Sequence, residues 1–362
     1  MPKLRVLIVD DAVVVRRILS ETLTADPDLE VFSAANGRIA LQKLDQVSPD
    51  IVTLDVEMPE LDGIETLKEL RKARPLLPVI MFSTLTERGA AATLDALAAG
   101  ANDYLTKPAN VGSVALASAR IKEELIPRIK VLCRFRQLSQ QAAQSPAAVA
   151  SVIRPASGVR GPVDVVAIGV STGGPNALSA ILPALPGDLP VPVVIVQHMP
   201  PIFTRLLAER LAAQCSVGVE EASPGMILSP GKVIIARGGV HMALRRVGGR
   251  VSVELNNDPP ENSCRPAVDA LFRSASAAYG ARMLGVVLTG MGSDGLRGCE
   301  IIREAGGQVI VQDEATSVVW GMPGFVARAG LAESQLPLQQ IAFEIVSRTA
   351  TGRTLKACAR AS

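Results

Sequence analysis

Three polar residues in the second half of the chain each follow an apolar run, and together they can break an acyl bond. Ser171 follows Val165–Val170, His198 follows V-P-V-V-I-V-Q, and Asp294 lies in a glycine-rich loop after L-G-V-V-L. A serine hydroxyl is a weak nucleophile until a base takes its proton, and the base needs an acceptor on its other ring nitrogen. These three residue types supply those parts, whatever their order along the chain.

A second serine-based arrangement is also open. Gly169–Gly173 fits G-x-S-x-G, the strand-to-helix turn that presents the nucleophile of α/β-hydrolases. That fold orders its residues as serine, acid and histidine, so the base would be His241 and the acid Glu220 or Glu221. His241 follows Lys232–Ala236 and a Gly-Gly turn, a pattern typical of a β-hairpin. The pattern favours a structural or substrate-side role for this histidine.

The glycine loop around Asp294 allows a different class of function. Gly290–Gly295 fits G-x-G-x-x-G, and Asp313 ends the next strand where dinucleotide-binding proteins have a ribose-binding acid. Against this, Asp294 would place a carboxylate beside a pyrophosphate, and too little chain follows for a complete nucleotide-binding half. A dinucleotide site also leaves Ser171 and His198 without a role, so we favour the hydrolase.

A second group of polar residues lies in the first third of the chain. Asp10 and Asp11 follow one apolar run, Asp55 follows another, and Ser83 and Lys107 follow two more. Carboxylates gathered in one place repel each other, and a hard divalent cation such as Mg²⁺ would explain the cluster. A lysine and a hydroxyl opposite the carboxylates suit a phosphoryl group.

Alternating strands and helices must position this second group. Such alternation predicts a doubly wound parallel sheet, in which the carboxyl ends of the strands meet at one edge. The expected helices lie at Val13–Leu23, Ala40–Leu44 and Glu65–Lys72. The expected strands are Leu4–Val9, Glu30–Ala34, Ile51–Leu54, Val79–Phe82 and Asp103–Thr106.

The segment around Ser171 predicts the same kind of sheet in the second half. Val165–Val170 has the continuous apolar character of a buried parallel strand. Gly173 and Gly174 permit a tight turn, and Pro175 suits the first position of a helix. We therefore expect Ser171 at the carboxyl end of a central strand, where open α/β sheets bind ligands.

The composition excludes several classes of partner. A length of 362 residues suits two domains, each with its own core. Lys+Arg total 37 against Asp+Glu 35 and aromatic residues are 3%, so we expect no nucleic-acid binding. No apolar run reaches a membrane span, and Asp10 and Asp11 exclude a signal peptide. The five cysteines include no C-x-x-C pair, so we expect a reduced, cytoplasmic protein without disulfides or a zinc site.

The first part of the chain resembles the receiver domain of two-component response regulators. The resemblance rests on the segments V-D-D, T-L-D-V-E-M-P-E-L-D-G, F-S-T and Y-L-T-K-P. It implies a flavodoxin-like fold in which Asp55 accepts a phosphoryl group from a chemotaxis-type histidine kinase. It also implies that Asp10, Asp11 and Asp55 hold Mg²⁺.

The same resemblance implies how such a receiver would switch. Ser83 and Lys107 would contact the phosphoryl group, and Tyr104 would change rotamer. A receiver changes shape but has no target chemistry of its own. The target must therefore lie in the second half.

The second half resembles the catalytic domain of chemotaxis protein-glutamate methylesterases, the CheB family. The segments are G-V-S-T-G-G-P, Q-H-M-P, C-R-P-A-V-D, L-T-G-M-G-S-D-G and Q-D-E-A-T-S-V-V-W-G-M-P. The resemblance implies Ser171 as nucleophile, His198 as base and Asp294 as its orienting acid, without a cofactor. The implied reaction hydrolyses glutamyl methyl esters on chemoreceptors and releases methanol, with deamidation of receptor glutamines as a related activity. The N–H groups near Thr172 and Met291 are candidate oxyanion donors.

The expected organisation has four parts. Residues 1–125 form the flavodoxin-like receiver, 126–162 a linker, 163–350 a doubly wound, mainly parallel α/β methylesterase domain, and 351–362 a tail. The linker is rich in Gln, Ala, Ser and Pro, as mobile tethers are. Phosphorylation of Asp55 is expected to raise esterase activity. We expect no direct insertion of the protein into a membrane. The non-enzymatic alternative is a response regulator whose second half binds a partner or a dinucleotide.

Overall fold

The computed structural model of the chain describes residues 2–107, 114–134 and 161–351. The chain folds into two compact units, Met1–Ala148 and Val149–Ser362. Residues 126–134 continue a helix, whereas the rest of the expected linker up to residue 160 and the tail from 352 lie outside the described residues. Within the described ranges, no helix has both the length and the apolar character needed to cross a membrane.

The first unit is a five-stranded parallel sheet with the order β2-β1-β3-β4-β5, as expected of a flavodoxin-like fold. Each strand boundary lies within one residue of its expected position. The strands are β1 (Leu4–Val9), β2 (Leu29–Ala34), β3 (Ile51–Asp55), β4 (Val79–Ser83) and β5 (Asp103–Thr106). The helices are α1 (Val13–Thr24), α2 (Gly37–Val47), α3 (Gly63–Ala73), α4 (Glu87–Ala98), α5 (Val114–Arg120) and the π-helix η1 (Ile121–Leu125).

Short polar side chains set the starts of three of these helices. Asp62 accepts a hydrogen bond from the N–H of Glu65, whose side chain bonds back to the N–H of Asp62, a capping box at α3. The side chains of Asn36 and Thr86 cap α2 and α4 by accepting from the N–H of Ile39 and of Gly89, without a reciprocal bond. These caps explain why α2 begins at Gly37, three residues before the apolar pattern indicates.

The second unit is a seven-stranded parallel sheet with the order β14-β13-β12-β6-β7-β9-β8. Its strands are β6 (Val165–Val170), β7 (Val193–Gln197), β8 (Gly218–Glu221), β9 (Lys232–Ile235), β12 (Met283–Val287), β13 (Gln308–Gln312) and β14 (Ser334–Leu336). Its helices are α7 (Gly174–Ile181), η2 (Leu182–Ala184), α8 (Pro201–Ala212), α9 (Val268–Tyr279), α10 (Leu296–Glu304), α11 (Met322–Arg328) and α12 (Leu338–Ala350). The expected doubly wound parallel fold is confirmed.

The core of the second unit has a layer on each face of this sheet. Val165 and Ala167 of β6 pack in one cluster with Leu271 and Phe272 of α9. The alternate residues of β6 are equally buried and point to the opposite face, because side chains alternate along a strand. Burial on both faces explains why the strand has no polar position until Ser171.

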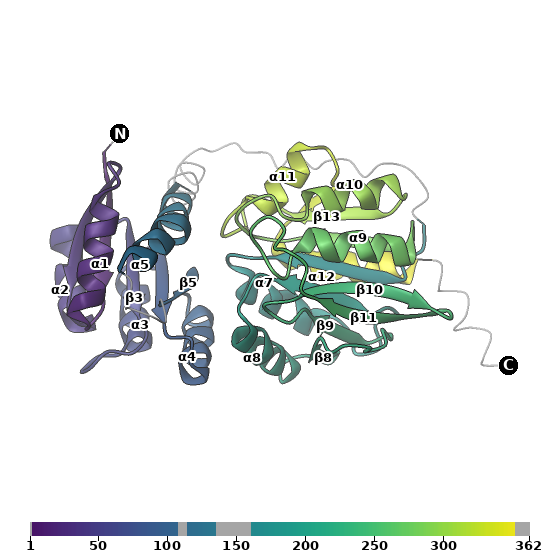
Figure 1. The fold of residues 1–362 in the computed structure, drawn as a ribbon, viewed down its shortest axis with the longest axis horizontal. Coiled ribbons are helices and arrows are strands. Elements are labelled where there is room, and N and C mark those ends of the chain that lie inside the picture. The colour runs from purple at the N-terminus through teal and green to yellow at the C-terminus, as the bar shows by residue number, and fades with distance from the viewer. Residues whose placement is uncertain (1, 108–113, 135–160, 352–362) are drawn as a thin grey trace. The chain divides into compact units, whose positions relative to one another are not determined.

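A β-hairpin covers the edge of this core. β10 (His241–Val247) pairs antiparallel with β11 (Arg250–Asn256), as the sequence predicts for the His241 region. Gly248 and Gly249 join the strands with φ of 55° and 80°, the left-handed conformation of a tight hairpin turn. In Figure 1 the hairpin lies beside α9.

Candidate active site and receiver site

Ser171 and His198 lie side by side at the carboxyl ends of β6 and β7. Val170 is in register with Gln197, so the next residue of each strand is Ser171 and His198. The N–H of His198 donates to the carbonyl of Val170 at 3.3 Å. Neighbouring strands are about 4.8 Å apart, so the sheet itself places the two residues next to each other.

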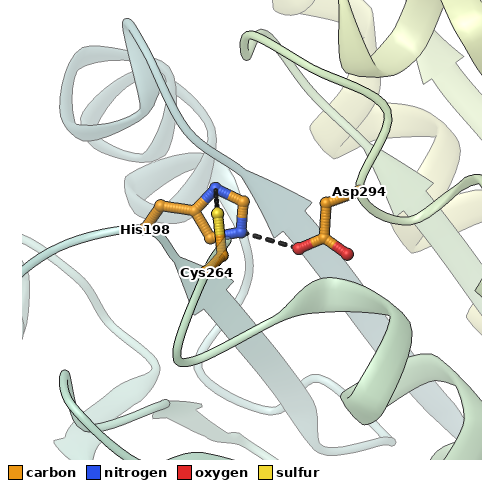
Figure 2. Close-up of side chains that lie close together, drawn as sticks. All are labelled: His198, Cys264 and Asp294. Atoms are coloured by element: carbon orange, nitrogen blue, oxygen red, sulfur yellow. Dashed lines mark hydrogen bonds and ion pairs between the residues drawn. The ribbon is translucent and has the colours of Figure 1, made fainter. Parts of the chain in front are cut away.

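Asp294 approaches the same place from the strand on the other side. It follows β12, which neighbours β6, so β6 carries Ser171 between the other two strands. His198 Nε2 and Asp294 Oδ2 are 2.8 Å apart, with exposed side-chain fractions of 12% and 2% (Figure 2). The structure therefore joins the predicted base to the predicted acid by a hydrogen bond.

Four further donors hold the Asp294 carboxylate. The N–H of Val268 donates to Oδ2 at 2.7 Å, and the N–H of Asp269, the N–H of Gly295 and the Asn262 side chain donate to Oδ1, each at 3.0 Å. Val268 and Asp269 are the first residues of α9, so the carboxylate also lies at a helix N-terminus, where negative charge is favoured.

The His198–Asp294 pair shifts both pKa values. Burial alone would lower the pKa of His198, but the hydrogen bonds to Asp294 and Cys264 outweigh burial and raise it from 6.5 to about 9. Burial alone would raise the pKa of Asp294, but bonds from His198 and from backbone N–H groups hold it below 3.8. The pair therefore favours an imidazolium beside a carboxylate, the state that a base needs to stabilise after it takes a proton.

The second ring nitrogen of His198 has a neighbour that the sequence reasoning missed. Cys264 Sγ lies 3.6 Å from His198 Nδ1 (Figure 2). Across the described residues, no hydrogen bond joins the Ser171 hydroxyl to either ring nitrogen, and such contacts are often long before substrate binds. Cys264 begins the C-R-P-A-V-D segment, and that position was the available signal for its importance.

A tight turn presents Ser171. Gly173 has φ of 77°, and a Cβ there would lie 2.7 Å from Val318, so both conformation and space require glycine. The carbonyl of Ser171 accepts from the N–H of Gly174 at 2.8 Å and from the Gln197 side chain at 3.1 Å. The prediction that Pro175 is the first residue of α7 is wrong by one position, because Gly174 begins the helix.

The loops that carry the candidate oxyanion donors are fastened together. The Thr289 hydroxyl donates to the carbonyl of Thr172 at 2.9 Å, and a Cβ on Gly290 would lie 2.9 Å from Ser171 Cβ. Over the described part of the chain, the Met291 N–H donates to no backbone carbonyl. The Met291 N–H, which has no backbone acceptor among the described residues, thus directly follows Gly290, the residue that packs on Ser171.

Backbone groups occupy both ring nitrogens of His241. This histidine is 1% exposed, its Nδ1 accepts from the N–H of Ala267 at 3.2 Å, and its Nε2 lies 3.1 Å from the carbonyl of Pro259. Glu220 pairs with Lys232, and Glu221 accepts from Thr204 at 2.7 Å. The arrangement with His241 as base is therefore not formed.

The dinucleotide alternative also loses its support. The Asp294 carboxylate takes the N–H donors at the start of α9 and in the glycine loop, which a pyrophosphate would need. Asp313 accepts from the N–H and hydroxyl of Thr316 at 3.0 and 2.6 Å, so its carboxylate closes a turn.

In the first unit, three of the expected residues meet at the edge of the sheet. Lys107 Nζ lies 2.6 Å from Asp55 Oδ2 and 2.9 Å from Asp10 Oδ2. Burial and the charge of Asp10 raise the pKa of Asp55 from 3.8 to about 6, although Lys107 opposes the shift. Two carboxylates thus share one ammonium in a buried site.

The carboxylates suit a divalent cation. One oxygen from each of Asp10, Asp11 and Asp55 lies within 4.8 Å of the others. The buried Oδ2 of Asp10 has no hydrogen-bond donor of good geometry among the described residues, although it is ion-paired with Lys107. An all-oxygen donor set of three neighbouring carboxylates fits Mg²⁺.

Ser83 and Tyr104 are both buried near this edge. The Ser83 hydroxyl donates to the carbonyl of Gly89 at 3.0 Å, and Tyr104 is 8% exposed. Burial raises the pKa of the Tyr104 hydroxyl, so the phenol stays neutral. The predicted contact of Ser83 with a phosphoryl group and the predicted rotamer change of Tyr104 remain predictions.

Comparisons with known proteins agree with both resemblances. A family model described as CheB methylesterase matches residues 166–345, and one described as response regulator receiver domain matches 6–117. Protein-glutamate methylesterase/protein-glutamine glutaminase of Trichodesmium erythraeum is 53% identical, over 96% of this chain and 99% of that protein. The protein of the same name from a Nocardioides species is 54% identical, over 98% and 97%.

A solved structure agrees with the fold of the second unit. The crystal structure of the Thermotoga maritima CheB methylesterase catalytic domain has a TM-score of 0.51 and 41% identity, covering 52% of this chain and 99% of that one. The relatives match this chain along nearly its whole length, receiver included. The chain therefore belongs to the CheB family of protein-glutamate methylesterases with an N-terminal receiver domain.

Proposed function

We propose that this chain is a protein-glutamate methylesterase that hydrolyses glutamyl methyl esters on chemoreceptors and deamidates receptor glutamines. The observation that carries the proposal is the His198–Asp294 hydrogen bond beside Ser171, at the ends of three neighbouring strands. The names of the relatives support the same two activities.

In the proposed chemistry, one ring nitrogen of His198 binds Asp294 and the other exchanges protons with Ser171 and the substrate. Nε2 is held by Asp294, so Nδ1 is the nitrogen that takes the proton as the Ser171 hydroxyl attacks the ester carbonyl. The imidazolium then gives the proton to the leaving methoxide, and methanol departs. Water, activated by the same nitrogen, releases the glutamate and restores the serine. Ammonia takes the place of methanol when the substrate is glutamine.

The negative charge that forms on the carbonyl oxygen needs donors. We assign this role to the N–H groups of Thr172 and Met291, because they belong to the two loops that pack at Ser171. Loss of one such donor costs about 10²–10³ in rate in other hydrolases.

The first unit is the proposed control element. In it, Asp10, Asp11 and Asp55 would hold Mg²⁺, which neutralises the charge around a phosphoryl group entering on Asp55. Lys107 and Ser83 would contact that group, and Tyr104 would follow by changing rotamer. A chemotaxis-type histidine kinase is the proposed phosphodonor, and the cytoplasm the proposed compartment. The proposed domain limits are 1–125 and 163–350.

Release of methanol from methylated receptor membranes tests the esterase. Ser171→Ala should lose about 10⁴–10⁶ of the activity, because the nucleophile is removed. Ser179→Ala, a partly exposed serine on α7, is the matched control and should keep normal activity. Normal methanol release by Ser171→Ala would overturn the proposal.

A further inference from the structure

The distance between Cys264 and His198 suits a bound metal ion. Sγ and Nδ1 are 3.6 Å apart (Figure 2). Zinc binds nitrogen at about 2.0–2.1 Å and sulfur at about 2.3 Å, so a tetrahedral angle places the two ligand atoms about 3.6 Å apart. The thiol and the imidazole therefore already have the spacing of two ligands of one zinc ion.

The other side of the imidazole also has the arrangement found at zinc sites. A metal-binding histidine usually donates its second N–H to a carboxylate, which fixes the ring and the tautomer. His198 Nε2 faces Asp294 at 2.8 Å, so in the neutral ring the proton stays on Nε2 and the lone pair of Nδ1 faces Cys264. Asp294 itself is occupied by four other donors and would remain behind the ring.

The turn that carries Cys264 is rigidly attached to the same carboxylate. Glu261 and Cys264 exchange two backbone hydrogen bonds of 3.1 and 2.8 Å around Asn262 and Ser263, which have φ of 51° and 62°. The Asn262 side chain donates to Asp294 at 3.0 Å and to Asp269 at 2.9 Å. Because the thiol is held in place before metal arrives, little ordering is required on binding.

We propose that Cys264 and His198 form a binding site for Zn²⁺ or a similar borderline-soft cation, which inhibits the esterase by occupying Nδ1. The inhibition rests on the proposed function, since Nδ1 is the nitrogen that takes the serine proton. On binding, the thiol releases its proton to solvent, a protonated imidazole also gives up its Nδ1 proton to solvent, and the freed lone pairs of sulfur and nitrogen coordinate the ion. Water fills the remaining positions, because both side chains are partly exposed.

The ligand chemistry separates this site from the carboxylates of the receiver. Mg²⁺ prefers oxygen ligands, whereas a thiolate with an imidazole selects zinc and related ions. Magnesium at the concentration used for phosphorylation should therefore neither inhibit the esterase nor relieve the inhibition by zinc.

A cobalt titration of the full chain tests the metal site without using activity. Co²⁺ bound to a thiolate gives an intense sulfur-to-metal absorption band, which carboxylate sites do not give. Wild type should show the band, Cys264→Ala should lose it, and the control Cys215→Ala, another partly exposed cysteine, should keep it. Absence of the band in wild type, or its persistence in Cys264→Ala, would overturn the site.

Methanol release in zinc-buffered solution then tests inhibition. Each protein is compared with its own rate in the presence of a chelator. Zinc should inhibit wild type reversibly, and Cys264→Ala should need at least tenfold more zinc for the same fractional loss. Equal sensitivity of the two proteins would refute inhibition through this site. Absence of methanol from chelator-treated wild type would refute the proposed function instead, and the cobalt titration would still decide the site.

Discussion

The two histidines of this chain differ in what their ring nitrogens face. His198 faces one carboxylate and one thiol, whereas both nitrogens of His241 face backbone groups. A nitrogen bound to the backbone has no freedom to exchange a proton with a substrate. Of the two histidines, only His198 has both ring nitrogens free of backbone partners among the described residues, which supports its proposed role as the base.

Replacing each histidine by alanine should separate a role in catalysis from a role in the fold. His198→Ala should abolish methanol release while the protein stays folded. His241→Ala should cost about 1–3 kcal/mol of unfolding free energy, because the Ala267 N–H and the Pro259 carbonyl are left unpaired in the interior. Chemical denaturation and activity per folded molecule measure the two effects. If only His241→Ala lost methanol release per folded molecule, His241 and not His198 would be the base.

The raised pKa of His198 predicts the pH dependence of the esterase. Nδ1 must be unprotonated to act as a base, and the pKa of about 9 keeps the ring mostly protonated at neutral pH. kcat/KM should therefore rise about tenfold per pH unit through neutrality and level off only near the pKa. A chelator in the assay removes any contribution from bound metal. A plateau already reached near the ordinary value of 6.5 would contradict the shift.

At the scale of elements, the site depends on how closely α9 approaches β6. A Cβ on Gly169 would lie 2.4 Å from Val268 Cγ1, at the start of the helix whose N–H groups bind Asp294. The strand and the helix can meet at this distance only because Gly169 has no side chain. Packing of the β6 backbone against α9 thus sets the position of the proposed catalytic carboxylate.

Gly169→Ala should therefore disturb both stability and activity. Overpacking costs about 1–3 kcal/mol of unfolding free energy, and the shift of α9 should lower kcat by more than the loss of folded protein explains. Gly285→Ala on β12 is the matched control, because its Cβ would meet the flexible end of Ile302 at 2.8 Å. Denaturant melts and kcat per folded molecule are compared for the two variants. Equal kcat in both would show that α9 does not position Asp294.

At the scale of the whole molecule, the chain joins a domain with a phosphoryl site to a domain with an acyl-transfer site. Moving a two-state switch from 1:99 to 99:1 requires about 5.5 kcal/mol, and one new phosphoryl group contacting Lys107 and Mg²⁺ is the proposed source. A few charge-assisted contacts of the phosphoryl group would therefore have to supply this free-energy difference between the two states of the switch.

Asp55→Asn should abolish activation by a small acyl phosphate. The measured quantity is the ratio of methanol release with and without the phosphodonor, which should fall to one because no carboxylate remains to accept the phosphoryl group. Asp45→Asn, with its side chain 90% exposed, is the control and should keep the wild-type ratio. A normal ratio in Asp55→Asn would remove Asp55 from the regulation.

Most of the fold and the partners of the base could be predicted from the sequence. Buried parallel strands are continuous apolar runs, so Ser171 and His198 could be placed at the ends of two strands and Asp294 in the loop after a third. The choice of these three over His241 or a dinucleotide site rests mainly on the family resemblance. Cys264 could not be placed, because a turn with two left-handed non-glycine residues brings it to the imidazole. The contact of Cys264 with His198 joins residues 66 positions apart in the sequence. Neither the hydrophobic pattern nor a metal-ligand spacing along the chain predicts such a contact.

The carboxylate of Asp294 has a consequence for how this protein tolerates change. Active-site charges are often a burden on folding, and removing them can make a protein more robust. Here the same charge binds two N–H groups at the start of α9 and one in its own loop, so its loss would weaken the fold as well as the reaction. If a lineage ceased to need the esterase, selection for a folded chain alone would still retain this aspartate, while the serine would be free to drift.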